Sequence, residues 1–219
     1  MSKILISGYY GFANAGDEAM LTAIIESLRQ VEKNVELTVL SGNPEDTAAK
    51  HQVCSVYRFN PLGIIRTMKD SELIISGGGS LLQDVTSKRS LLYYLSIIGL
   101  GKFFGKKVML FAQGIGPIRA KWARKLTSLV CNEADLITVR DSESAAELIE
   151  MGVKPEKITV TADSVLSLNP VTKECGQYLL QEAGVDLTKP VIGISVRPWS
   201  GDSQCFQVLA EAASKLQQS

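Results

Sequence analysis

Three consecutive glycines follow an apolar run in the stretch LIISGGGSLLQD, residues 73–84. A glycine turn behind a strand can present several backbone N–H groups in a concave nest, and a helix N-terminus beyond it adds partial positive charge. Such a nest binds a phosphate or carboxylate without a basic side chain. The substrate-binding candidates in this stretch are Gly77, Gly78, Gly79, Ser80 and Asp84. The alternative interpretation is a tight turn packed against another loop.

A lone arginine closes the otherwise apolar run DLITVR, residues 135–140. The planar guanidinium of Arg140 matches a carboxylate or phosphate with two parallel hydrogen bonds, which makes it a candidate catalytic residue. Asp141 follows it as a substrate-binding candidate. The sequence leaves a second account open, in which Arg140 forms a salt bridge to Asp141 or Glu143.

The first loop, GYYGFANAGDEA, covers residues 8–19 and combines glycines with an amide and an acid ahead of a predicted helix. We assign Gly11 and Asn14 to substrate binding. Asp17 is a catalytic candidate that would orient or deprotonate a hydroxyl, or else it serves only as a helix cap or first-turn acid. The loop lacks the GxGxxG spacing of dinucleotide-binding folds, and no Walker motif occurs in the chain.

Strands and helices alternate along the sequence, which predicts an α/β fold, a Rossmann-like doubly wound parallel sheet. The expected strands are residues 3–7, 35–41, 52–59, 71–76, 107–113, 135–140 and 157–162. Ligands of such sheets bind outside the carboxyl ends of the strands, where all the candidates above fall. Gln113 belongs to this edge as well. Its amide suits hydroxyl recognition on a sugar, although a turn with Pro117 is an equally good account.

Composition limits the classes of function. Lys+Arg and Asp+Glu both number 23, so the formal net charge is zero and nothing favours a nucleic-acid partner. His51 is the one histidine, so a histidine-based metal cluster cannot be built from this chain. We expect no metal and no cofactor. The apolar stretch SLLYYLSIIGLGKFFG, residues 90–105, is shorter than the ~20 apolar residues of a membrane span. We interpret it as a buried helix, and a surface that touches a membrane or a lipid-linked substrate is the alternative.

The end of the chain predicts a second domain. After a polar helix at residues 175–186, the stretch KPVIGISVRPW reads as a new buried strand and CFQVLAEAASKLQQ as its helix. We therefore expect an N-terminal domain over residues 1–186 and the start of a truncated second α/β domain over 187–219. The alternative is that this strand joins the first sheet.

Taken together, these motifs resemble the polysaccharide pyruvyl transferase family, with the CsaB-type branch that acts on secondary cell-wall polymers as the nearest match. The matching stretches are GYYGFANAGDEAML, SGGGSLLQDVTSKRSLLYYL, VMLFAQGIGP, ITVRDSESAAEL and VTADSVL. The resemblance implies the N-terminal half of a two-domain fold similar to GT-B glycosyltransferases. It also implies transfer of pyruvate from phosphoenolpyruvate to a sugar as a cyclic ketal, without a metal.

In that branch the acceptor is an N-acetylmannosamine on a lipid-linked or nucleotide-linked precursor in the cytoplasm, at the inner face of the plasma membrane. A homo-oligomer stays open. The family's Arg-Leu-His element, which helps bind phosphoenolpyruvate and supplies the catalytic histidine, does not occur in this sequence. We therefore expect this chain to be inactive alone. Two rival functions remain: a GT-B glycosyltransferase that uses a nucleotide sugar, and a non-catalytic carbohydrate-binding module.

Overall fold

The structure is a computed structural model that describes residues 2–194, 196 and 203–218. Within that part, seven parallel strands form one sheet in the order β3-β2-β1-β4-β5-β6-β7. The strands are β1 Lys3–Tyr10, β2 Glu36–Ser41, β3 Cys54–Tyr57, β4 Leu73–Gly77, β5 Lys107–Gln113, β6 Leu136–Val139 and β7 Ile158–Val160. The predicted α/β, Rossmann-like doubly wound sheet is confirmed.

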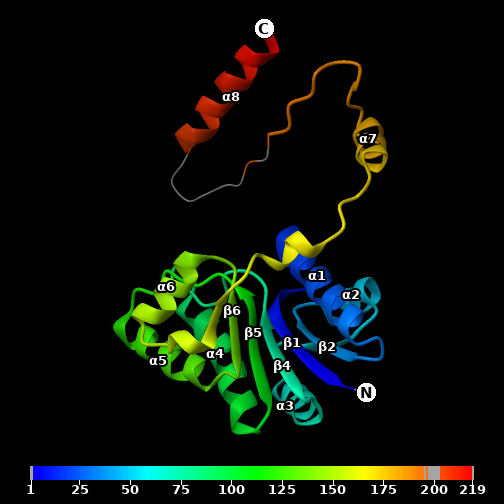
Figure 1. The fold of residues 1–219 in the computed structure, drawn as a ribbon. Helices are drawn as coiled ribbons and strands as arrows, with labels where there is room; N and C mark the ends of the chain where they lie inside the picture. The colour runs from blue at the N-terminus through cyan, green and yellow to red at the C-terminus, as the bar shows by residue number, and fades with distance from the viewer. Residues whose placement is uncertain (1, 195, 197–202, 219) are drawn as a thin grey trace. The chain divides into compact units, whose positions relative to one another are not determined.

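Helices connect the strands (Figure 1). They are α1 Ala15–Val31, α2 Pro44–His51, α3 Pro61–Asp70, α4 Lys88–Phe103, α5 Lys121–Glu133 and α6 Ser142–Glu150, with short 3-10 helices η1 Pro155–Lys157 and η2 Ser164–Ser167. The sequence pattern predicts α1, α3, α4, α5 and α6, and it predicts neither α2 nor the two 3-10 helices. Helix α2 was missed because PEDTAAKH carries no apolar stripe, and Thr47 is its buried residue.

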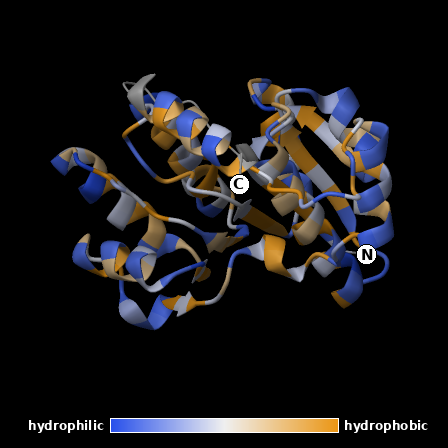
Figure 2. Cartoon of the chain, turned by 90° about the horizontal axis from the view of Figure 1, so that it is seen from above, coloured by the Kyte–Doolittle hydropathy of each residue, from blue (hydrophilic) through white to orange (hydrophobic). Residues whose placement is uncertain are grey.

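One hydrophobic core lies on each face of the sheet. Helix α1 covers one face through Leu21 and Ile24, which pack with Ile6 of β1. Helices α3, α4, α5 and α6 supply the core on the other face. Figure 2 shows hydrophobic residues concentrated in the strands and hydrophilic residues on the surrounding helices. This arrangement leaves the carboxyl edge of the sheet open to its connecting loops.

The predicted buried helix is α4. Leu91, Leu95 and Ile98 are at most 2% exposed, as expected for one stripe at helical spacing. Leu92, which we also placed in the core, is 41% exposed because it lies about 100° around the helix from Leu91. Among the described residues, no helix is both long and apolar enough to cross a membrane.

The direction of winding reverses between β1 and β4, since the chain runs outward through β2 and β3 and then returns to β4. Open α/β sheets bind ligands at this switch point. Two irregularities flank it: pairing shifts between Ser7 and Tyr10 of β1, and one extra residue lies between Leu110 and Gln113 of β5. Bulges of this kind redirect side chains and occur near functional sites.

The contacts divide the chain into two units, residues 1–169 and 170–219. The expected boundary after residue 186 stays a prediction, although α7 (Lys173–Glu182) falls in the second unit. The strand predicted at residues 189–199 does not form in its described part, residues 189–194 and 196, and it does not join the first sheet. Residues 195 and 197–199 lie outside the described residues. A strand requires a hydrogen-bonded neighbour, and the described residues supply none here. Helix α8 (Ser203–Gln218) forms as predicted.

Candidate functional site

The triple glycine ends β4 at the switch point, and all three residues are buried. Gly78 and Gly79 have φ values of 79° and 70°, which favour glycine. Their N–H groups already have acceptors: Gly78 donates to the Phe111 carbonyl at 3.4 Å, and Gly79 donates to the Met20 sulfur at 3.0 Å. Helix α4 begins only at Lys88, so the glycine turn does not lie at the N-terminus of this helix and gains no positive charge from it. The geometry therefore favours a tightly packed turn over an N–H nest.

Helix α1 lies directly against this turn. A Cβ on Gly79 would lie 3.1 Å from Oδ1 of Asp17, and one on Gly78 would lie 3.3 Å from the Cβ of Met20. Asn14 is the N-cap of α1 and accepts the Gly16 N–H at 3.1 Å, so Asp17 is a first-turn acid and not the cap. The carboxylate of Asp17 is thus held beside the glycine turn, where a substrate hydroxyl could reach it.

Gly11 fixes the first loop. Its φ is 78°, a Cβ there would overlap with Oγ of Ser41, and its N–H donates to Glu18 at 2.8 Å. His51, at the end of α2, lies 3.4 Å from the same Glu18 carboxylate. A shallow depression of about 520 Å³ opens between this loop and α2, but it includes neither Asp17 nor the glycine turn.

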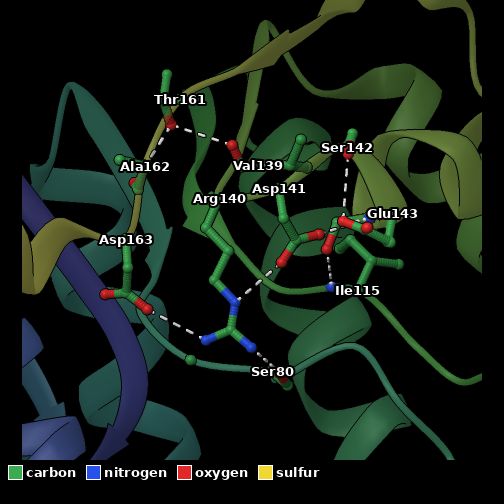
Figure 3. A network of polar contacts seen from close by, with 12 residues as sticks. Ser80, Ile115, Val139, Arg140, Asp141, Ser142, Glu143, Thr161, Ala162 and Asp163 are labelled. Carbon is green, nitrogen blue, oxygen red and sulfur yellow. Dashed lines mark hydrogen bonds and ion pairs between the residues drawn. The ribbon is translucent and has the colours of Figure 1, made fainter.

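Arg140 lies on the other side of the turn (Figure 3). Its Nη2 donates to Oγ of Ser80 at 3.1 Å, and its Nη1 lies 3.1 Å from Oδ2 of Asp163. Its Nε lies 3.4 Å from Oδ2 of Asp141. Gly114 admits the side chain, since a Cβ there would lie 2.7 Å from the Arg140 Nε. The salt bridge to Asp141 that we considered is present, so the guanidinium faces two carboxylates.

Asp141 and Asp84 have structural partners of their own. Asp141 caps α6 by accepting the Ser144 N–H at 2.7 Å, and this contact with Ser144, together with Arg140, lowers the pKa of its carboxyl. Asp84 accepts the N–H groups of Ala120 and Arg119, both at 2.9 Å, and these bonds hold its pKa below the usual value. Asp84 therefore ties the glycine loop to the start of α5, away from the Arg140 group.

Gln113 is fully buried, and its Nε2 donates to Oγ of Ser76 at 2.9 Å. Its Oε1 has no hydrogen-bond partner in the described part of the chain. The side chain therefore lies beneath the edge loops and faces the sheet. Hydroxyl recognition by Gln113 remains a prediction.

The structure thus brings Asp17, the glycine turn, Ser80 and Arg140 together and leaves Asn14 and Asp84 at the margins. We did not single out two further residues that follow strands at this edge of the sheet, and of these Asp163 contacts the group through Arg140. Asp163 follows β7 in the strand-end sequence TADS, which was a usable signal. Arg58 follows β3 between two aromatic residues and is only 5% exposed.

Comparison with known proteins gives a family and a fold. A family profile described as polysaccharide pyruvyl transferase matches residues 14–200. No curated protein matches the chain. Among solved structures, HepE from Anabaena in complex with UDP and glucose is similar, with a TM-score of 0.61 and 14% identity over 96% of this chain. A glycosyltransferase from Rickettsia africae has a TM-score of 0.59 and 14% identity over 99% of this chain.

Both likenesses show the fold alone, which is that of GT-B glycosyltransferases. The chain spans 58% of the length of each of these two structures.

Proposed function

The chain belongs to the polysaccharide pyruvyl transferase family, and on that premise we propose that it moves pyruvate from phosphoenolpyruvate onto a sugar of a cell-wall polysaccharide as a cyclic ketal. The family match over residues 14–200 is the observation that carries the proposal. The likeness to sugar-handling folds, one of them described with UDP and glucose, supports a sugar as the second substrate.

The donor dictates what the site must do. Phosphoenolpyruvate carries a carboxylate and a phosphate on one enol carbon, and protonation of its methylene makes that carbon electrophilic. One sugar hydroxyl adds to the carbon and loses its proton. A second hydroxyl then adds while phosphate leaves. The protein must therefore hold two anionic groups, supply a general acid and accept the protons of the hydroxyls.

We assign the acceptor side to Asp17. Its carboxylate lies beside Gly79, in the first turn of a helix that packs on the glycine turn. From that position it can orient or deprotonate a sugar hydroxyl. The acceptor we propose is an N-acetylmannosamine unit on a lipid-linked or nucleotide-linked precursor, handled at the inner face of the cytoplasmic membrane.

We assign a donor contact to Arg140. Its side chain is 33% exposed, and a guanidinium has five N–H groups, whereas Arg140 has three partners in the structure. It can therefore still donate to a substrate oxygen. Asp141 and Asp163 hold its orientation and at the same time reduce its attraction for an anion.

The general acid has no candidate in this sequence, since the Arg-Leu-His element is absent. We therefore propose that the 219 residues alone do not complete the transfer. The test incubates this chain, and any longer protein that carries it, with phosphoenolpyruvate and an N-acetylmannosaminyl acceptor. Phosphate release together with the mass of the ketal product supports the proposal. Multiple turnovers by the 219 residues would overturn our account of the acid.

The fold favours one rival function, a glycosyltransferase that uses a nucleotide sugar. That activity would release a nucleotide in the same incubation when a nucleotide sugar replaces phosphoenolpyruvate. Sugar binding without either product would instead indicate a carbohydrate-binding module.

A further inference from the structure

Arg58 is a buried cation among aromatic rings on the α4 face of the sheet. Its backbone N–H donates to the Ser41 carbonyl at 2.9 Å, which fixes the residue at the carboxyl end of β3. Its guanidinium carbon lies near four ring centroids: Tyr93 at 4.4 Å, Phe59 at 5.1 Å, Phe12 at 5.4 Å and Tyr94 at 5.6 Å. Only 5% of the residue is exposed.

Arg58 forms no ion pair with a carboxylate of the described residues within 4.0 Å. The carboxylate of Asp17 acts on Tyr94 of the same cluster, but only as a nearby charge. The Nε of Arg58 is buried without an acceptor. Cation–π contacts attract the charge to the ring faces, but they do not accept the in-plane N–H groups. Burying a cation without hydrogen-bond acceptors is expensive.

Three hydroxyl groups in the same cluster have no hydrogen bond of good geometry in the part of the chain that the structure describes, although Arg58 lies near both tyrosine hydroxyls and Ser7 lies near that of Tyr93. The three hydroxyls belong to Ser7, Tyr93 and Tyr94. Burial raises the pKa of both tyrosines, to about 12 for Tyr94, although the nearby charge of Arg58 acts in the opposite direction. The hydroxyl of Tyr94 therefore stays protonated and can donate.

The cluster lies at the switch point of the sheet. Ser7 stands opposite Ser76 in the pairing of β1 with β4, directly before the triple glycine. The hydroxyl of Tyr10 donates to the Gly77 carbonyl at 2.6 Å, and Tyr94 is close enough to contribute to the raised pKa of Tyr10. Tyr10 therefore lies between the glycine turn and the cluster that holds Arg58.

A ligand would reach the guanidinium past two half-exposed phenyl rings. Phe12 and Phe59 cover the guanidinium and are 42% and 61% exposed. Phe12 belongs to the first loop, where Gly11 and Ala13 both have positive φ values. Rotation of a half-exposed phenyl side chain is fast, so it can uncover the guanidinium edge without rearranging the sheet.

We propose that Arg58, with the hydroxyls of Ser7, Tyr93 and Tyr94, forms a subsite for the phosphate group of a substrate. The inference rests on the proposed function. A phosphate has several terminal oxygens that can accept one guanidinium and several hydroxyl donors together, and the site supplies donors with no competing carboxylate. Arg140, by contrast, already faces Asp141 and Asp163. The phosphate comes either from phosphoenolpyruvate or from the diphosphate that links the acceptor sugar to its carrier.

The test measures binding to the 219-residue chain by calorimetry and by the ligand-dependent rise in Tm. The probes are phosphoenolpyruvate, UDP and inorganic phosphate, and the variants are Arg58→Gln and, as a matched control on the exposed face of α3, Arg66→Gln. A charge-assisted contact of this kind corresponds to roughly a 10- to 100-fold change in Kd. We expect that loss for Arg58→Gln and none for Arg66→Gln. Preference for phosphoenolpyruvate or for UDP identifies the source of the phosphate.

Equal binding of all probes by Arg58→Gln and the wild type overturns the subsite, as does the failure of every probe to bind the wild type. If Arg58→Gln does not fold, the variant with Tyr93→Phe and Tyr94→Phe replaces it, because it keeps both rings and removes only the hydroxyls. Unchanged binding of the probes by that double variant also overturns the subsite. Binding needs no turnover, so loss of phosphate binding by the variants supports the subsite whether or not pyruvate transfer is observed. Absence of pyruvate transfer by a longer protein that carries this chain contradicts the proposed function alone. Pyruvate transfer by that protein, together with unchanged binding by the variants, contradicts the subsite alone.

Discussion

Nη1 of Arg140 lies 3.1 Å from Oδ2 of Asp163, and this contact joins the carboxyl ends of β6 and β7. Asp141 faces the same guanidinium at 3.4 Å, so the three side chains together carry a net charge of −1. The two carboxylates hold the arginine fork in one orientation at the edge of the glycine turn. They also mean that Arg140 binds an anion less strongly than an unpaired arginine would.

The first prediction tests Arg140 in the donor site. Arg140→Lys keeps the charge and loses the fork, so kcat/KM for phosphoenolpyruvate should fall by roughly 10- to 100-fold in the active protein. Arg124→Lys is the matched control, because Arg124 also faces two carboxylates, Glu147 at 2.7 Å and Glu150 at 3.4 Å. Saturation kinetics and Tm are measured for both. Equal donor use by the two variants and the wild type would remove Arg140 from the site.

The second prediction concerns the packing of the glycine turn. Gly78 has a φ of 79°, and a Cβ there would lie 3.1 Å from the Tyr10 hydroxyl, so Gly78→Ala should destabilise the fold by about 1–3 kcal/mol. A Cβ on Gly99, inside α4, would meet none of the described atoms within 4 Å, and Gly99→Ala should stabilise by about 0.5–1 kcal/mol. Denaturant unfolding of both variants checks the opposite signs. A stable Gly78→Ala would contradict the tight turn.

The third prediction separates the two faces of α4. Leu95 is 2% exposed, and Leu95→Asp should prevent soluble expression, since it removes about 1.5–3 kcal/mol of burial and places an unpaired charge in the core. Leu92 is 41% exposed, and Leu92→Asp should remain soluble with a Tm within a few degrees of the wild type. The yield of soluble protein and the Tm are measured for both variants. Normal folding of Leu95→Asp, with loss of binding to vesicles, would assign this helix to a membrane surface instead.

The fourth prediction is a pH dependence at Asp84. The N–H groups of Ala120 and Arg119 hold its pKa below the usual value in the folded state, so the carboxylate contributes stability above its unfolded pKa of about 3.9. That contribution disappears as the pH falls through the folded pKa. Asp84→Asn should therefore be less stable than the wild type at pH 7, by about 1 kcal/mol, and the difference should shrink as the pH falls below the unfolded pKa.

Melting temperatures at pH 7, 5 and 3 check this behaviour, with Asp70→Asn at the exposed end of α3 as the control. The control variant should follow the wild type at every pH. A stability difference for Asp84→Asn that is equally large at pH 3 and at pH 7 would mean that the side chain acts through its shape and not through its charge.

Hydrophobic pattern was sufficient to predict the sheet of the first unit, because each strand is an apolar run followed by polar or glycine residues. It was not sufficient for α2, whose stability depends on the Asn43 cap and the buried Thr47 and not on an apolar stripe. The segment that begins at Pro190 is apolar as well, yet its described residues form no strand, because pairing depends on a neighbour and not on composition alone.

For the candidate site, the sequence predicted which residues lie at the edge of the sheet but not which partners they contact. The position of polar residues at strand ends identified Asp17, Ser80 and Arg140, since parallel strands carry their carboxyl ends to one edge. The sequence could not show which groups already have partners. The N–H of Gly79 meets Met20, 59 residues away, and Arg140 meets Asp163, 23 residues away. Arg58 was missed because its four aromatic neighbours come from three separate segments.

The bulge that the extra residue forms in β5 determines which face of the sheet the side chain of Gln113 occupies. If the same residues continued as a regular strand, their side chains would alternate to its end, and position 113 would point to the α1 face. Deleting Ala112, whose φ is 47°, would restore regular pairing with β6 and would keep the amide on the Ser76 face, because Gln113 would then follow Phe111 directly. The loop that begins at Gly114 would, however, start one step earlier and draw its backbone away from Arg140. The number of residues in β5 therefore sets the position of the loop beside Arg140, whichever residue types the strand contains.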